Sequence, residues 1–141
     1  MRRAVAIAVA AALGLSACAY FNALYNAKRL FAEAETAAAR GQTGAADASY
    51  TRAIEKAAKS LRKDPDGRWA DDALYLIGRA HFARGDAAAA RAALERLLRE
   101  TSDREIATGA RAYLGAAIVR LGQPGEALIH LARAIDQAGR G

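Results

Sequence analysis

The chain has 141 residues, 53% of them apolar, a formal net charge of +6 and a single cysteine. This length allows one modest domain, and one cysteine excludes a disulfide within the chain. Alanine, the strongest helix former, supplies much of the apolar content, while runs of Val, Ile or Thr are rare, so we predict an all-α fold. Basic residues alternate with acidic ones rather than gathering beside aromatic residues, and we therefore expect no nucleic-acid partner.

The first 17 residues have the organisation of a secretory signal peptide. Arg2 and Arg3 form a positively charged start, and the uncharged apolar run Ala4–Leu15 is too short to cross a membrane. A longer uncharged stretch, Ala4–Ala27, leaves open an uncleaved membrane-spanning anchor, although two asparagines interrupt its far end.

The apolar run ends in "LSAC" at residues 15–18, which resembles the lipobox of bacterial lipoproteins. The resemblance implies that residues 1–17 are removed and that residues 18–141 form a lipid-anchored domain. The thiol of Cys18 would accept a diacylglycerol and its freed amine a further acyl chain such as palmitate, and two or three chains hold a protein stably on a membrane. Ala19 stands where an aspartate would favour the inner membrane, which implies an outer-membrane lipoprotein that faces the periplasm.

Two segments in the second half of the chain, Leu76–Leu98 and Tyr113–Ile135, repeat at an offset of 37 residues. A weaker copy that contains Gly41 and Tyr50 precedes them at an offset of 44 residues. The matched positions are Gly78 with Gly115, Gly85 with Gly122, Ala90 with Ala127, and Leu94 with Leu131.

These repeats predict three antiparallel helix hairpins. A glycine inside a helix costs about 1 kcal/mol relative to alanine, so Gly78 and Gly115 indicate places where the second helix of a pair approaches closely. The next glycine suits the left-handed turn that ends the first helix. The predicted helices are about Tyr20–Arg40, Ala45–Lys63, Arg68–Arg84, Asp86–Glu100, Arg104–Leu121 and a last one to Ala138, in units of about 20–63, 68–100 and 104–138.

Polar residues between the units are candidate helix caps. We expect Asp66 to cap the third predicted helix and Thr101 or Ser102 to cap the fifth. We also expect the carboxylates of Asp71, Asp72 and Asp103, which lie at helix starts, to cap and complement the helix dipole there. No polar capping helix follows the last one, so we expect its outer face to be open to a partner or frayed.

The repeated frame resembles the tetratricopeptide repeat, in which a helix with Leu-Gly-x-x-Tyr precedes a helix with Ala-x-x-x-Phe-x-x-Ala. Residues 77–81 ("IGRAH") and 114–118 ("LGAAI") match the first helix, and Ala90 and Ala127 open the matches to the second. The resemblance implies a right-handed solenoid in which the first helix of each pair lines a groove that binds a protein or peptide. The side chains that this register places in the groove are Phe31, Glu35, Tyr75, Arg79, Phe82, Tyr113 and Arg120.

Aromatic rings and arginines of this kind can anchor a peptide. Tyr75 and Phe82 could equally fill the space between hairpins, and both interpretations stay open at this point.

No residue pattern predicts catalysis. His81 and His130 lie at non-equivalent positions of different units, whereas a zinc site needs more ligands in a fixed geometry. No nucleophile has a base at a recognisable spacing, and no glycine-rich loop suits a phosphate. We therefore expect no enzyme activity, no metal and no cofactor other than the covalent lipid at Cys18.

Together, the lipobox and the repeats resemble bacterial outer-membrane lipoproteins of this repeat class, such as the family of lipoprotein component D of the β-barrel assembly machinery. The resemblance implies a lipid-anchored periplasmic scaffold or adaptor that binds protein partners in outer-membrane protein assembly. The alternative is a pilotin-like lipoprotein that escorts a subunit for secretion or pilus assembly.

Overall fold

The computed structural model describes residues 23–140, and the predicted signal peptide and Cys18 lie outside this part of the chain. The described residues are helical apart from short connections, which confirms the predicted all-α class. The first helix covers residues 23–39. The helices that follow are α2 (Thr43–Lys63), α3 (Ala70–Ala83), α4 (Ala87–Glu100), α5 (Arg104–Arg120) and α6 (Pro124–Ala138).

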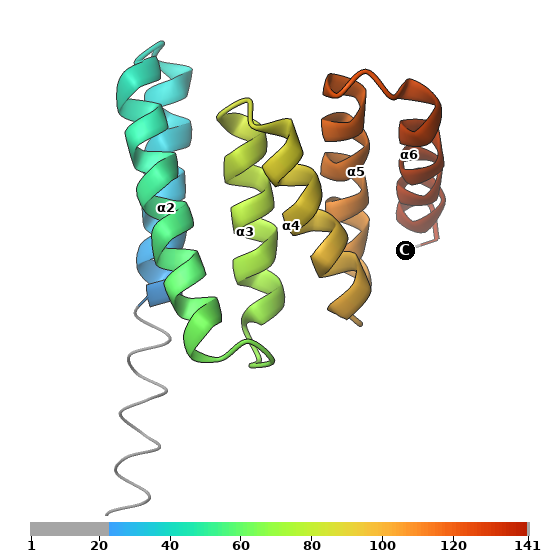
Figure 1. Cartoon of the computed structure of the whole chain (residues 1–141), viewed down its shortest axis with the longest axis horizontal. Coiled ribbons are helices and arrows are strands. Elements are labelled where there is room, and N and C mark those ends of the chain that lie inside the picture. The colour runs from blue at the N-terminus through green and yellow to red at the C-terminus, as the bar shows by residue number, and fades with distance from the viewer. Residues whose placement is uncertain (1–22, 141) are drawn as a thin grey trace, which may run out of the picture.

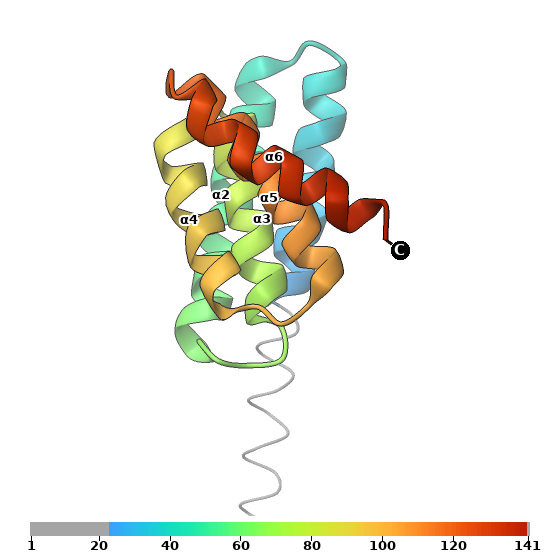
Figure 2. The same cartoon turned by 90° about the vertical axis from the view of Figure 1, so that its right-hand side faces the viewer.

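Successive helices run antiparallel and form hairpins that stand side by side (Figure 1). Helix α3 contacts α2, α4 and α5, whereas among the labelled helices α4 contacts neither α2 nor α6. The first helix, α3 and α5 therefore form an inner layer, and α2, α4 and α6 form an outer layer. Figure 2 shows α6 at the end of the stack, where it crosses α5.

The three predicted turn glycines adopt the left-handed conformation. Gly41, Gly85 and Gly122 have φ angles of +73°, +85° and +78°. In each turn the residue after the glycine donates its backbone N–H to a carbonyl five residues earlier, as Asp86 does to His81 at 2.9 Å. This hydrogen bond closes a helix end with glycine at the left-handed position.

The helix glycines Gly78 and Gly115 mark close helix contacts, as predicted. A Cβ atom at Gly78 would lie 2.6 Å from Cγ of Leu94, and one at Gly115 would lie 2.6 Å from Cγ of Leu131. Leu94 is fully buried, whereas Leu131 is only partly buried because it lies in the last helix. In each of these two hairpins the leucine of the second helix therefore packs on the glycine of the first helix.

Two predicted caps are wrong. Helix α3 starts at Ala70 and has Trp69, not Asp66, at its N-cap position, because the N–H of Gly67 bonds the Asp64 carbonyl in a tight turn that precedes the helix. Helix α5 is capped by Asp103, whose carboxylate accepts from Glu105 and Ile106.

Thr101 and Ser102, the predicted caps of α5, precede its cap residue. The Thr101 hydroxyl donates to Asp71 at 2.6 Å and accepts from the Asp103 N–H at 3.0 Å. The threonine therefore joins the start of α3 to the start of α5.

Helix α6 has an open outer face, as expected. Its buried residues are the alanines Ala127 and Ala134, while Leu128, Ile129 and Ile135 are exposed.

At the other end of the domain, Leu24 and Ala27 are buried in the core. Any membrane-spanning anchor would therefore have to end before them.

Candidate functional site

The seven side chains predicted to line the groove form one connected cluster on the inner layer, and four of them contact Arg79 directly. The Arg79 guanidinium carbon lies 4.5 Å from the ring centre of Phe31, 5.6 Å from that of Tyr75 and 5.5 Å from that of Tyr113. These rings come from the first helix, α3 and α5, so one arginine of α3 joins all three inner helices. A cation beside an aromatic face is attracted by the ring electrons, by about 0.5–1 kcal/mol at exposed sites.

The aromatic rings of α3 and α5 pack edge to face. The ring centres of Tyr75 and Tyr113 are 6.1 Å apart, and those of Phe82 and Tyr113 are 5.6 Å apart. The Arg120 guanidinium covers Phe82 at 3.6 Å and donates to its carbonyl oxygen at 2.6 Å. Since Tyr75, Phe82 and Tyr113 are half-buried, part of each ring remains available to a partner.

Phe31 forms the floor of this cluster. Its side chain is only 7% exposed, and its ring packs edge-on against Tyr50 of α2 at 5.3 Å. Phe31 therefore supports Arg79 from beneath and leaves little surface for direct contact. Tyr50 was not among the predicted groove residues, although its place in the repeat is that of Leu94, which packs on the inner helix of its own hairpin.

Two ion pairs connect the first helix to α3 across the inner layer. The Nζ atom of Lys28 lies 2.8 Å from Oδ1 of Asp72, and the Nη2 atom of Arg79 lies 3.1 Å from Oε1 of Glu35. In both pairs the partners are 44 residues apart, which is the offset between the first two units. Each pair therefore joins equivalent positions of neighbouring hairpins and balances the charge there.

Arg120 differs from these paired groups. Within residues 23–140 no carboxylate lies within 4.0 Å of its guanidinium, and the residue is exposed. It leaves a positive charge at the end of the cluster nearest the turn between α5 and α6.

Tyr75 of the cluster and Tyr50 beneath it remain neutral hydrogen-bonding groups. Burial raises the pKa of Tyr75 above its usual value, and Arg79 opposes this change. Burial, followed by the charge of Glu35, likewise raises the pKa of Tyr50. A protonated tyrosine hydroxyl can both donate and accept, so the cluster offers aromatic faces, a hydroxyl and cations together.

Gly109 is a groove residue that the sequence analysis missed. A Cβ atom there would lie 2.4 Å from the hydroxyl oxygen of Tyr75, so this glycine makes room for the ring. With the 37-residue offset, Gly109 is the equivalent in the third unit of Asp72 in the second, and Asp72 lies on the inner layer. The repeat register could therefore have identified Gly109 as an inner-layer residue.

The histidines do not meet each other. The imidazole Nδ1 of His81 faces Asp86 at 3.4 Å, and burial lowers its pKa while Asp86 opposes that change. Among residues 23–140, no three His, Cys, Asp or Glu side chains are grouped as metal ligands. No helix in the same part of the chain is long and apolar enough to cross a membrane.

A hollow of about 420 Å³ lies away from the Arg79 cluster, along the outer side of the first helix. It is lined by Arg29, Ala32, Glu33, Thr36, Ala37, Arg40 and Gln42. Since Arg29 and Glu33 in its wall already pair with each other along the first helix, we do not assign it to a partner.

Comparison with known families identifies the repeat. The profile of the tetratricopeptide repeat-like domain matches residues 2–140. No curated protein matches the chain significantly.

Proposed function

Because the chain belongs to the tetratricopeptide repeat-like domain family, we propose that it is a scaffold that binds a protein segment on the Arg79 cluster. The observation that carries this proposal is the convergence of half-exposed rings from α3 and α5 around an arginine. Rigid aromatic residues and arginines provide most of the binding energy in many protein interfaces. Tyr75 and Tyr113 add hydroxyls that can bond a peptide backbone.

We further propose that Cys18 carries a lipid anchor and that the domain faces the periplasm from the outer membrane. The support is in the sequence: a charged start, an apolar run and "LSAC" stand in the order that export and lipidation require. A scaffold in this place would hold its partner close to the membrane, which suits a role in envelope or outer-membrane protein assembly.

The lipid anchor predicts a specific effect of Cys18→Ser. The variant should lose incorporation of labelled palmitate and should keep residues 1–17, because the lipidated cysteine is the substrate of cleavage. Labelling followed by gel mobility and mass spectrometry of the N-terminus measures both effects. If the wild type takes up no label and keeps its leader, the domain is held by an uncleaved anchor or not at all.

The groove predicts where a partner can be crosslinked. A photoreactive phenylalanine derivative in place of Phe82 should capture a partner protein in cells, since this ring is half-buried beside the exposed Arg120. Matched controls at Lys56 of α2 and Ala92 of α4, both exposed on the outer layer, should capture it at least about tenfold less.

Equal capture from the outer layer would contradict the groove assignment. The identity of the captured protein also separates the two roles, because an assembly factor should yield β-barrel proteins or their machinery, whereas a pilotin should yield a secretion or pilus subunit.

A further inference from the structure

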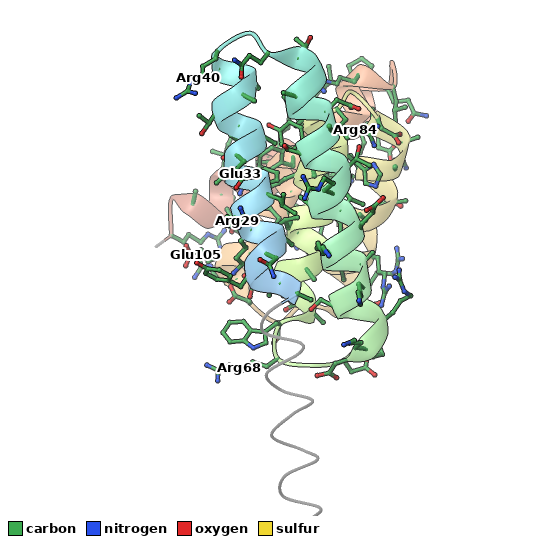
Figure 3. All side chains as sticks on the ribbon, turned by 90° about the vertical axis from the view of Figure 1, so that its left-hand side faces the viewer. Arg29, Glu33, Arg40, Arg68, Arg84 and Glu105 are labelled. Atoms are coloured by element: carbon green, nitrogen blue, oxygen red, sulfur yellow. The ribbon has the colours of Figure 1, made fainter. Side chains whose placement is uncertain are left out.

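We propose that the loop at residues 64–69, between α2 and α3, rests against the lipid bilayer with Trp69 at its interface. This inference rests on the proposed membrane attachment and adds the orientation of the domain. The loop and the first turn of the first helix lie at the same end of the solenoid, and the loop extends further in that direction (Figures 1 and 3).

The side chains of this end confirm that the loop and the first helix are neighbours. The ammonium nitrogen of Lys28 lies 6.0 Å from the centre of the Trp69 ring and 2.8 Å from Asp72. Arg68 covers the same ring at 4.7 Å. Figure 3 shows Arg68 at this end, and Arg40 and Arg84 at the opposite end, where the three glycine turns lie.

The covalent chain limits how far this end can be from the membrane. Cys18 and Ala23 are five residues apart, a distance of at most about 18 Å when fully extended. An uncleaved anchor would end before Leu24 and would leave still less free chain. Helix α5 has 17 residues and is therefore about 26 Å long, so the opposite end lies much further from the bilayer.

The chemistry of the loop suits a bilayer surface. Tryptophan is enriched at membrane interfaces because its apolar ring and its N–H group match the boundary between acyl chains and water. Residues 59–69 contain four basic side chains (Lys59, Arg62, Lys63 and Arg68) and two acidic ones (Asp64 and Asp66), a net charge of 4 − 2 = +2.

These basic groups are available to anionic headgroups. None of the four has a carboxylate within 4.0 Å among the described residues. Basic residues near an anionic membrane surface are attracted to its headgroups. At the opposite end, Arg84 is paired with Asp47 at 2.7 Å, whereas Arg40 and Arg120 have no carboxylate within 4.0 Å among the described residues. Charge alone therefore does not distinguish the two ends, and the short chain between Cys18 and the first helix selects the end with the loop.

Trp69 is the only tryptophan of the chain, so its fluorescence reports on this loop alone. The full, membrane-attached protein would be reconstituted in vesicles of phosphatidylcholine and phosphatidylglycerol, with or without phosphatidylcholine brominated near the headgroup end of its acyl chains. We expect bromine to quench roughly half of the emission, because quenching requires near contact of the ring with the brominated interface.

The matched control is the double variant Trp69→Phe with Leu121→Trp, which moves the single tryptophan to the exposed end of α5 at the far side of the domain. Its emission should be quenched by less than about a tenth, since that position lies about one helix length away. Equal quenching of the two proteins would contradict an end-on orientation, and unquenched Trp69 would contradict contact of the loop.

Labelling of Cys18 in the same preparation separates this inference from the lipid anchor. Labelled protein with unquenched Trp69 would overturn the loop contact and leave the anchor in place. Unlabelled protein that stays in the vesicles with Trp69 quenched would overturn the lipid anchor and support the orientation. Protein that does not remain with the vesicles would contradict both.

Discussion

Leu94→Ala is expected to lower the free energy of unfolding by about 3 kcal/mol, because it removes a fully buried leucine and leaves a cavity. The lost side chain sits on the backbone of α3 at Gly78, where a Cβ atom would lie 2.6 Å from Leu94 Cγ. Chemical denaturation followed by helical circular dichroism measures the change. The helix content in the absence of denaturant should stay near that of the wild type.

The contact between Leu94 and Gly78 can be tested by combining two substitutions. Gly78→Ala alone should cost about 1–2 kcal/mol, because the new methyl group overlaps a leucine that is held on all sides. In the Leu94→Ala background the same change should be neutral or stabilising by up to about 1 kcal/mol, since alanine is the better helix residue and the space is now free.

Such a reversal measures the interaction between the two positions. The repeat provides the control: Gly115→Ala faces the partly buried Leu131, which can move aside, and should cost less than Gly78→Ala. If Gly78→Ala costs the same with and without Leu94, close approach of the helices is not the reason for the glycine.

Arg79→Ala is the second substitution with a large expected effect. It should lower the free energy of unfolding by about 2 kcal/mol, because the rings of Phe31, Tyr75 and Tyr113 each lose a cation that contributes roughly 0.5–1 kcal/mol. Denaturation measures this loss. In the crosslinking assay from position 82, capture of the partner should fall at least about tenfold.

Arg79→Met separates packing from recognition. The unbranched apolar side chain can fill the space between the rings, and Glu35 loses its partner but is half exposed, with 52% of its side chain accessible to water. We therefore expect a stability within about 1 kcal/mol of the wild type, because contacts of the methionine sulfur with the rings replace much of the lost cation attraction and because exposed ion pairs contribute little. Partner capture should still fall. Undiminished capture by the methionine variant would show that Arg79 only supports the fold.

The repeat made much of the inner layer predictable from the sequence. Offsets of 37 and 44 residues place Phe31, Tyr75 and their neighbours on one side, and the glycine positions predict both the turns and the close helix contacts. What brings residues onto one face is the period of the repeat, and the period can be read without coordinates.

The sequence places several candidate caps at the start of α5 but does not decide among them. The outcome depends on competition between neighbouring polar groups. Thr101 bonds Asp71, thirty residues away, and Asp103, which the sequence also predicts to act at this helix start, is the N-cap residue. The depth of Phe31 is also a tertiary result, because it is set by Tyr50 on α2 rather than by the pattern of its own helix.

The two ion pairs between the first helix and α3 favour one alignment of the neighbouring hairpins. Along the first helix a positive charge at Lys28 is followed by a negative one at Glu35, and α3 carries the opposite order at Asp72 and Arg79. If one helix slid by two turns along the other, Glu35 would lie beside Asp72. If another copy of the first hairpin took the place of the second, lysine would lie beside lysine and glutamate beside glutamate. The charges therefore favour the second hairpin in one alignment and disfavour a copy of the first hairpin in its place.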